Sequence, residues 1–325
     1  MCARRFSCRH VLISCLRLIT KSWIVFVQAI VLSFESIVVE FLTEIHGISS
    51  LLVAGIGIPL AGMTLLFIST VLSKKITVFK SWKPLLVASI FLAAAVFLWY
   101  DSVTRVGASK EGLLAGPLET IVVLILAWLL LKERLRKIQL VGVIIALLGF
   151  FATVSSHSLD LSTIFPLVIT FGDLEAILSA FAFAGGVIVM TKLVKRYTTI
   201  EVTGASLLIS GLILAILFIL STSQISIPTV QEWIFLVLFS LLPLAAALLY
   251  VIGLDRIGAS LTSTITSSNI LFTLFLQLIF KGLGVKSNLP ENILLALIGG
   301  ALGIIGIYLV HIEKDYLLRK KKIGT

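Results

Sequence analysis

Two glutamates lie inside long apolar segments of this 325-residue chain, where a carboxyl group could carry chemistry. In a helix rising ~1.5 Å per residue, Glu35 lies about 21 Å beyond Lys21, and Glu119 about 14 Å beyond Lys110. An ionisable group at such a depth in a membrane span costs roughly 2.5–3.5 kcal/mol, which makes it a functional candidate. We predict that Glu35 and Glu119 bind a substrate ammonium or carry a coupling proton. The alternative is a structural hydrogen bond to a neighbouring helix.

Neutral polar side chains add a second set of candidates. Gln28 lies two helical turns before Glu35 and shares its face. Further along the chain, polar residues recur at helical spacing on one stripe, namely Thr262, Thr266, Asn269, Thr273 and Gln277. We predict that Gln28 and the stripe residues Thr262, Thr266, Asn269 and Thr273 line a hydrated path for a polar substrate. Hydrogen bonding between helices is the alternative.

Other side chains have plainer interpretations. Gly112 and Gly116 share a face with Glu119 and indicate close helix packing there, as do Gly142, Gly149, Gly299, Gly303 and Gly306 in two later segments. Three aromatic residues are expected in the belts at the membrane interfaces, namely Trp99, Tyr100 and Tyr250. Four charged residues are expected to form a solvated outer rim, namely Asp101, Arg105, Lys110 and Glu111.

The residue pattern predicts no metal site, no cofactor and no catalytic centre. The three cysteines (Cys2, Cys8 and Cys15) stand near the start of the chain without CxxC spacing, and the four histidines are scattered. A membrane-embedded enzyme would need a group of catalytic or metal-binding side chains near one membrane face. We therefore do not expect an enzyme.

The composition requires these residues to be positioned by membrane spans. The chain is 59% hydrophobic and 13% charged, against roughly 25% charge in a soluble domain, and its mean hydropathy is +1.15. Apolar runs long enough to cross a bilayer recur throughout, and lipid requires them to be helical. We predict an all-α membrane protein with ten transmembrane helices, near 23–43, 49–72, 84–104, 110–131, 138–155, 173–191, 201–220, 232–252, 259–280 and 292–312.

The basic residues give this layout an orientation. With residues 1–22 placed in the cytoplasm, all 26 Lys and Arg residues except Arg105, Lys110, Lys281 and Lys286 lie on the cytoplasmic side. We therefore expect a multi-pass protein of the cell membrane with both tails, 1–22 and 313–325, in the cytoplasm. The net charge of +10 is assigned to topology and to anionic lipid, and nucleic acid is not expected as a partner.

An internal repeat divides the spans into two sets of five. The segment Arg105–Ser109 (Arg-Val-Gly-Ala-Ser) aligns with Arg256–Ser260 (Arg-Ile-Gly-Ala-Ser), and each joins the third span of a half to the fourth. Five spans per half place the second half upside down, so Arg105 falls outside and Arg256 inside. The sequence thus predicts two inverted five-helix repeats, an arrangement common in secondary transporters.

Several ordered motifs resemble one transporter family. They are Gly107-Ala108-Ser109, Gly116-Pro117-Leu118, Leu131-Lys132-Glu133-Arg134-Leu135, Gln139-Leu140-Val141-Gly142-Val143, Leu148-Gly149 and Phe171-Gly172-Asp173-Leu174-Glu175-Ala176. The chain resembles an EamA-type transporter of the drug/metabolite transporter superfamily over 23–155 and 173–312, with 156–172 as the connecting loop. The arginine often seen in the second helix of such a repeat is absent from 49–72 and 201–220, which weakens any anion-binding role taken from the family.

The resemblance implies a cavity lined mainly by the first, third, fourth, sixth, eighth and ninth helices. It also implies the export or exchange of a small metabolite. We predict a secondary transporter that moves a small polar compound, such as an amino acid or a sugar, through the lipid bilayer by alternating access, with a proton as one possible coupling ion. The alternatives are a channel or lipid scramblase and a membrane-embedded lipid-modifying enzyme.

Overall fold

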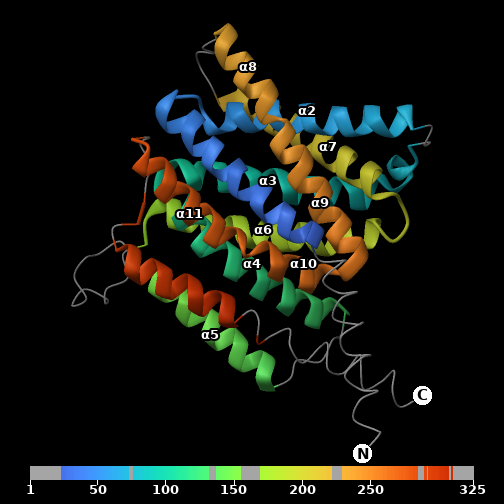
Figure 1. Ribbon diagram of the computed structural model, residues 1–325. Helices are drawn as coiled ribbons and strands as arrows, with labels where there is room; N and C mark the ends of the chain where they lie inside the picture. Colours follow the sequence, from blue (N-terminus) through green and yellow to red (C-terminus); the bar gives the residue numbers. More distant parts are fainter. Residues whose placement is uncertain are drawn as a thin grey trace, which may run out of the picture.

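The computed structural model describes residues 23–72, 76–131, 137–154, 169–221, 229–284, 289–290, 292–306 and 309. The expected tails 1–22 and 313–325, and most of the loop 156–172, lie outside this part of the chain. Helices make up nearly all of it, and it contains no strand. In order they are Trp23–Ile45, which ends in the π-helical turn Phe41–Ile45, α2 (Ser50–Val71), α3 (Trp82–Val106), α4 (Ala108–Leu131), α5 (Lys137–Val154), α6 (Phe171–Leu193), α7 (Thr199–Ser221), α8 (Val230–Phe239), α9 (Leu241–Ile257), α10 (Ala259–Thr266), α11 (Asn269–Gly282) and Ile293–Gly306 (Figure 1).

Each predicted span coincides with helix, and six of the described helices are long and apolar enough to cross a membrane. These six are Trp23–Ile45, Ser50–Val71, Val78–Val106, Phe171–Leu193, Thr199–Ser221 and Val230–Ile257. The helices Asn269–Gly282 and Ile293–Gly306 are shorter. The count of ten spans therefore stays a prediction.

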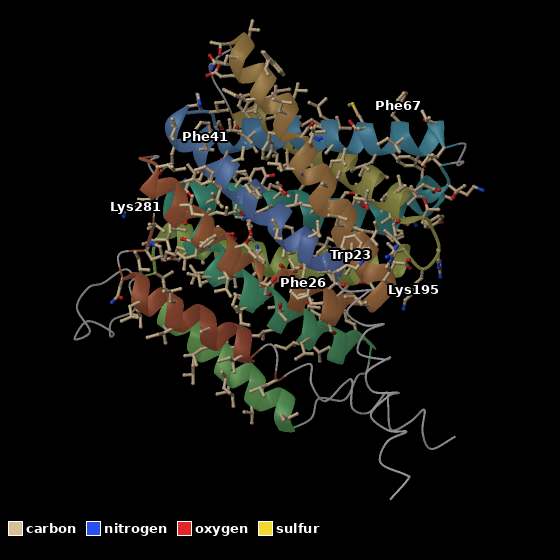
Figure 2. All side chains as sticks on the ribbon, in the orientation of Figure 1. Trp23, Phe26, Phe41, Phe67, Lys195 and Lys281 are labelled. Atoms are coloured by element: carbon tan, nitrogen blue, oxygen red, sulfur yellow. The ribbon has the colours of Figure 1, made fainter. Side chains whose placement is uncertain are left out.

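The polarity of the bundle is opposite to that of a soluble protein. Large apolar side chains cover its outside, and Phe67 and Trp23 there are 68% and 55% exposed (Figure 2). Acidic side chains are instead buried among the helices, including Glu35 and Glu201. Because water would disfavour this exposed apolar surface, the distribution is that of a bundle surrounded by lipid.

Two expected spans are interrupted. The span expected at 232–252 breaks at Ser240, and Pro243 follows in the first turn of α9, where a missing N–H costs no intrahelical bond. The span expected at 259–280 breaks at Ser267 and Ser268. The Ser268 hydroxyl donates to the carbonyl of Ile265 at 2.6 Å, a local bond that competes with helix continuation.

The two copies of the repeated Arg-x-Gly-Ala-Ser segment adopt the same backbone conformation. Gly107 between α3 and α4 has φ 86° and ψ 155°, and Gly258 between α9 and α10 has φ 83° and ψ 168°. This region is essentially restricted to glycine. The two turns lie at opposite ends of the first helix, because Glu40 near its end contacts Ala108 while Val25 near its start packs against Gly253. We refer to these as the Gly107 end and the Gly258 end.

Helices from the two halves also pack in pairs at backbone distance. A methyl group added at Gly211 of α7 would lie 2.3 Å from Cδ of Pro59 in α2. One added at Gly149 of α5 would lie 2.5 Å from the carbonyl oxygen of Gly299, in the helix Ile293–Gly306 that runs beside α5 (Figure 1). The close packing expected at the glycines of the fifth and tenth spans is therefore confirmed, and these two helices are each other's partners. Small residues at these contacts hold the halves together.

Candidate functional site

A cavity lies between the two halves of the chain. Its walls come from the first helix, α2, α3 and α4 of the first half, and from α6, α7, α9, α10 and α11 of the second. Its empty space amounts to about 1090 Å³, counted out to its open mouth.

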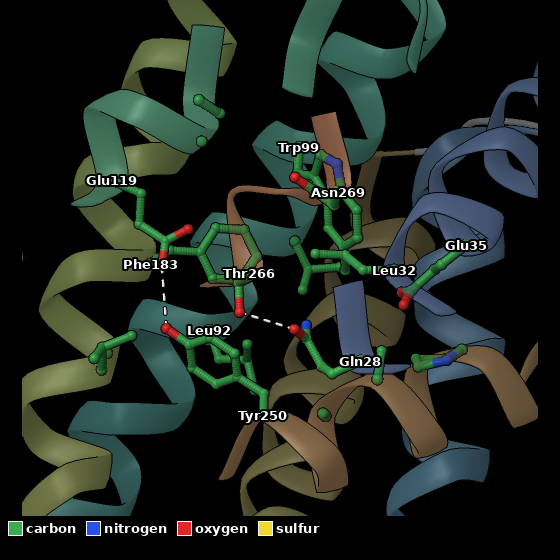
Figure 3. A pocket seen from close by; sticks show the side chains of 18 of the residues that line it. Gln28, Leu32, Glu35, Leu92, Trp99, Glu119, Phe183, Tyr250, Thr266 and Asn269 are labelled. Atoms are coloured by element: carbon green, nitrogen blue, oxygen red, sulfur yellow. Dashed lines mark hydrogen bonds between the residues drawn. The ribbon is translucent and has the colours of Figure 1, made fainter. Parts of the chain in front are cut away.

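Two carboxyl groups on its wall are held by tyrosine hydroxyls. The hydroxyl of Tyr100 donates to Oε1 of Glu35 at 2.6 Å, and both side chains are buried. The hydroxyl of Tyr250 donates to Oε1 of Glu119 at 3.2 Å (Figure 3). The first bond lies within one half, whereas the second joins α4 of the first half to α9 of the second. The cavity therefore contains both glutamates that the sequence singled out, each with a neutral donor.

The predicted neutral residues are divided between the cavity and the packed interior. Gln28, Thr266 and Asn269 line the cavity, and the hydroxyl of Thr266 donates to Oε1 of Gln28 at 2.8 Å. Figure 3 shows this pair between Glu119 on one side of the pocket and Glu35 on the other.

The remaining members of the polar stripe are buried but do not line the cavity, namely Thr262, Thr273 and Gln277. The hydroxyl of Thr262 donates to the carbonyl of Gly258 within its own helix. Because the stripe spans the break at Ser267 and Ser268, its residues lie on two short helices instead of one continuous face.

Two residues that sequence analysis assigned to a solvated rim are buried instead. Lys110 is fully buried, and its Nζ lies 2.5 Å from Oδ1 of Asp173. Glu111 is 4% exposed and lines the cavity. Both predictions were wrong, because burial depends on the neighbouring helices that cover the start of α4. The sequence did hold a signal, since Glu111 shares the helical face of Glu119 two turns further on.

The aromatic residues expected at the membrane interfaces also belong to the interior. Trp99 and Tyr250 line the cavity, and Tyr100 is completely buried. The repeat alignment places Trp99 and Tyr250 at equivalent positions, and both line the cavity. The sequence alone shows that the two positions correspond. That both face the cavity depends on the fold.

Polar contacts between the halves lie at both ends of the cavity. At the Gly107 end, Nε of Arg105 in α3 lies 3.1 Å from Oε2 of Glu175 in α6, and Lys110 of α4 pairs with Asp173 of α6. The side-chain amide of Gln277 in α11 also donates to Glu40 of the first helix there.

At the Gly258 end the contacts between the halves are hydrogen bonds. The backbone N–H of Thr77 donates to Oε2 of Glu201 at 3.0 Å, and the hydroxyls of Ser81 and Tyr197 are 2.6 Å apart. Each contact joins a residue before α3 to one at the start of α7 or just before it. Polar bonds between the halves thus lie on both sides of the central cavity.

Comparison with known proteins places this architecture in a family. The chain matches none of the curated proteins with which it was compared. A solved crystal structure, described only as that of a protein, is similar in fold with a TM-score of 0.60 at 19% sequence identity, over 87% of this chain and 96% of the other. The family model of the EamA-like transporter family matches residues 21–155 and again 170–312. Two repeats of that family thus account for most of the chain, which belongs to the EamA-like transporter family.

Proposed function

We propose that this protein is a secondary transporter that moves a small molecule across the membrane by alternating access, with the central cavity as the substrate site. The observation that carries the proposal is the position of the cavity, which lies at the seam between the halves and has polar contacts between them at both ends. In this proposal the ten spans form two inverted repeats, and both tails lie in the cytoplasm.

The contacts at the two ends suit a two-state carrier. Arg105 and Glu175 at the Gly107 end, and Thr77 and Glu201 at the Gly258 end, come from opposite halves. Rocking one half against the other would break one set of bonds while keeping the other. The substrate would then reach the cavity from one side of the membrane at a time.

The purified full chain, reconstituted in liposomes, tests this proposal. The liposomes are loaded with a mixture of amino acids, sugars and small amines, and the solutes retained are followed by mass spectrometry. A carrier is expected to show saturable loss of one class of solute and faster exchange when that solute is also present outside. Arg105→Gln at the Gly107 end and Ser81→Ala at the Gly258 end are both expected to change the exchange rate.

The controls separate a carrier from the alternatives. Glu232→Gln alters an exposed residue that caps α8, and it is expected to leave exchange unchanged. A lasting single-channel conductance in planar bilayers would contradict the proposal in favour of a pore. Protein-dependent movement of fluorescent lipid between leaflets, without solute exchange, would contradict it in favour of a scramblase.

A further inference from the structure

The described residues that line the cavity include acidic side chains but no basic one. Glu35, Glu111 and Glu119 all line it, whereas no Lys, Arg or His occurs among the described residues that do so. Lys110, the neighbour of Glu111 in sequence, directs its ammonium to Asp173 at the Gly107 end. An ionised carboxylate inside a membrane bundle needs a nearby cation, since burying it without one is costly. A positively charged group on a ligand could therefore balance the carboxyl groups of the described cavity wall.

The carboxyl groups are oriented by neutral donors that leave them able to accept more bonds. Tyr100 donates to Glu35, and Tyr250 donates to Glu119. A carboxylate has about four acceptor positions on two oxygens, so one phenol leaves most of them for a ligand. The phenols hold the two carboxyl groups in place and bring no positive charge.

The same wall also contains a buried hydrogen-bond acceptor, the side-chain oxygen of Asn269. The side-chain oxygen Oδ1 of Asn269 is buried, and it has no hydrogen-bond partner within the part of the chain that the structure describes. Asn269 lines the cavity (Figure 3). Leaving such an acceptor unpaired costs about 1–3 kcal/mol. An alkylammonium group has three N–H donors and no acceptor, which matches a wall with free acceptors and negative charge.

The rest of the wall is apolar and aromatic. Leu32, Leu92, Val96 and Phe183 lie between the polar residues of the cavity. The ring of Phe183 packs edge-on against Trp99, with the ring centroids 5.8 Å apart. Such a surface favours a hydrocarbon body, and aromatic faces attract organic cations. A sugar would leave many hydroxyls unpaired against this surface.

Two other classes of ligand, metal ions and amino acids, fit this wall less well. In the described residues no group of three or more His, Cys, Asp or Glu side chains could hold a metal ion. An amino acid carries a carboxylate, which would face three glutamates without a basic residue to receive it. The remaining class is an organic amine without a carboxylate.

We propose that the cavity binds a primary amine with an apolar or aromatic body. The carboxyl groups of Glu35 and Glu119 attract its ammonium from opposite sides of the cavity, and the ammonium donates a hydrogen bond to Oδ1 of Asn269. This assignment rests on the proposed transport function and narrows its substrate class from polar metabolites to apolar amines. In this assignment the carboxyl groups of Glu35, Glu111 and Glu119 select for charge, and the apolar wall selects for the size of the ligand.

Binding to the purified full chain in detergent tests the assignment with four small probes. The probe 2-phenylethylamine carries both the ammonium and the aromatic body, 2-phenylethanol lacks the charge, L-phenylalanine adds a carboxylate, and ethylamine lacks the aromatic ring. Titration calorimetry is expected to show saturable binding of 2-phenylethylamine. Each of the other three probes is expected to bind at least about tenfold more weakly. 2-Phenylethanol and ethylamine each lose one of the matched interactions, and L-phenylalanine brings a carboxylate that the acidic wall repels. Equal or tighter binding of 2-phenylethanol or L-phenylalanine would overturn the proposal.

Variants then assign the binding to the named residues. Glu35→Gln and Glu119→Gln keep the side-chain size and are each expected to raise the Kd for 2-phenylethylamine at least about tenfold. Asn269→Ala is expected to weaken the binding of 2-phenylethylamine. It should not weaken the binding of the N-trimethyl analogue, which has no N–H to donate. The exposed Glu232→Gln is the matched control and is expected to keep the original Kd. Size-exclusion elution and thermal unfolding identify any variant that has not folded, in which case Glu111→Gln takes its place.

The results also separate this assignment from the transport proposal. Unchanged Kd values in all folded cavity carboxyl variants would overturn the amine site. Exchange of some other solute in liposomes, without competition by 2-phenylethylamine, would also overturn the amine site while leaving transport intact. Binding of 2-phenylethylamine that follows the variants as expected, without exchange of any solute, would keep the amine site and contradict transport.

Discussion

The hydroxyl of Tyr250 donates a hydrogen bond to Glu119 at 3.2 Å, and this bond connects the two halves of the chain across the cavity. The other phenol–carboxyl pair, Tyr100 with Glu35 at 2.6 Å, lies within the first half. A motion of one half against the other would therefore strain the bond between Tyr250 and Glu119 and leave the bond between Tyr100 and Glu35 intact. The two pairs provide a matched comparison of a bond that crosses the seam with one that does not.

Single substitutions test both bonds, and a double-mutant cycle measures the bond between Tyr250 and Glu119. Tyr100→Phe is expected to lower the free energy of unfolding by about 1–3 kcal/mol, because it leaves a buried acceptor unpaired. Tyr250→Phe is expected to cost less, since its bond is longer and Glu119 is only partly buried. Combining Tyr250→Phe with Glu119→Leu should cost less than the sum of the two single changes. The measurement is unfolding by SDS titration in mixed micelles, and strict additivity would show that the pair is not coupled.

The buried ion pair of Lys110 and Asp173 gives a second stability prediction. Lys110→Met or Asp173→Leu alone is expected to destabilise the chain by about 3–5 kcal/mol, because a charge stays buried without its partner. The double variant should recover a large part of that loss, since both charges are then gone. Thermal unfolding of the three variants in detergent checks this. A double variant less stable than either single one would contradict it.

Packing between α2 and α7 depends on the absence of a side chain at Gly211. A methyl group there would overlap Cδ of Pro59 at 2.3 Å, so Gly211→Ala is expected to destabilise the chain by about 1–3 kcal/mol. Gly282→Ala is the matched control, because nothing lies within 4 Å of a methyl group at that position. It should be neutral or slightly stabilising, as alanine favours the helix. Equal effects of the two changes on thermal unfolding would refute the packing argument.

Labelling from one side of the membrane tests the proposed topology. Lys195 and Lys281 are exposed and lie at opposite ends of the bundle (Figure 2). In a chain with Cys2, Cys8 and Cys15 changed to serine, Lys281→Cys should react with an impermeant maleimide added to intact cells. Lys195→Cys should react only after the cells are permeabilised, because basic segments stay in the cytoplasm.

The outcomes of this labelling separate two claims. Reaction of both positions from the same side would contradict the odd number of spans expected between them in the second repeat. Reaction of Lys195→Cys alone in intact cells would keep these spans but reverse the orientation of that repeat. In both cases the introduced thiols are reduced first, and the reductant is removed before the maleimide is added.

Much of this protein could be predicted from the order of its residues. Membrane spans follow from local composition, because a run of about 20 apolar residues in lipid must satisfy its own backbone as a helix. The same local logic identified Glu35 and Glu119, since a carboxyl group inside such a run is rare and costly. The repeated Arg-x-Gly-Ala-Ser segment likewise predicted a shared turn, and Gly107 and Gly258 adopt the same positive φ.

Only the tertiary structure decided which side chains meet. Glu111 was assigned to an outer rim by its distance from a helix end, yet neighbouring helices cover it and place it in the cavity wall. The polar stripe was read as one continuous face, yet the break at Ser267 turns Thr262 and Thr273 away from the cavity and leaves Thr266 in its wall. Helix periodicity describes a face of one helix, whereas burial is a property of every helix packed around it. The pairing of Tyr250 with Glu119, far apart in sequence, depends on that packing and on nothing local to either residue.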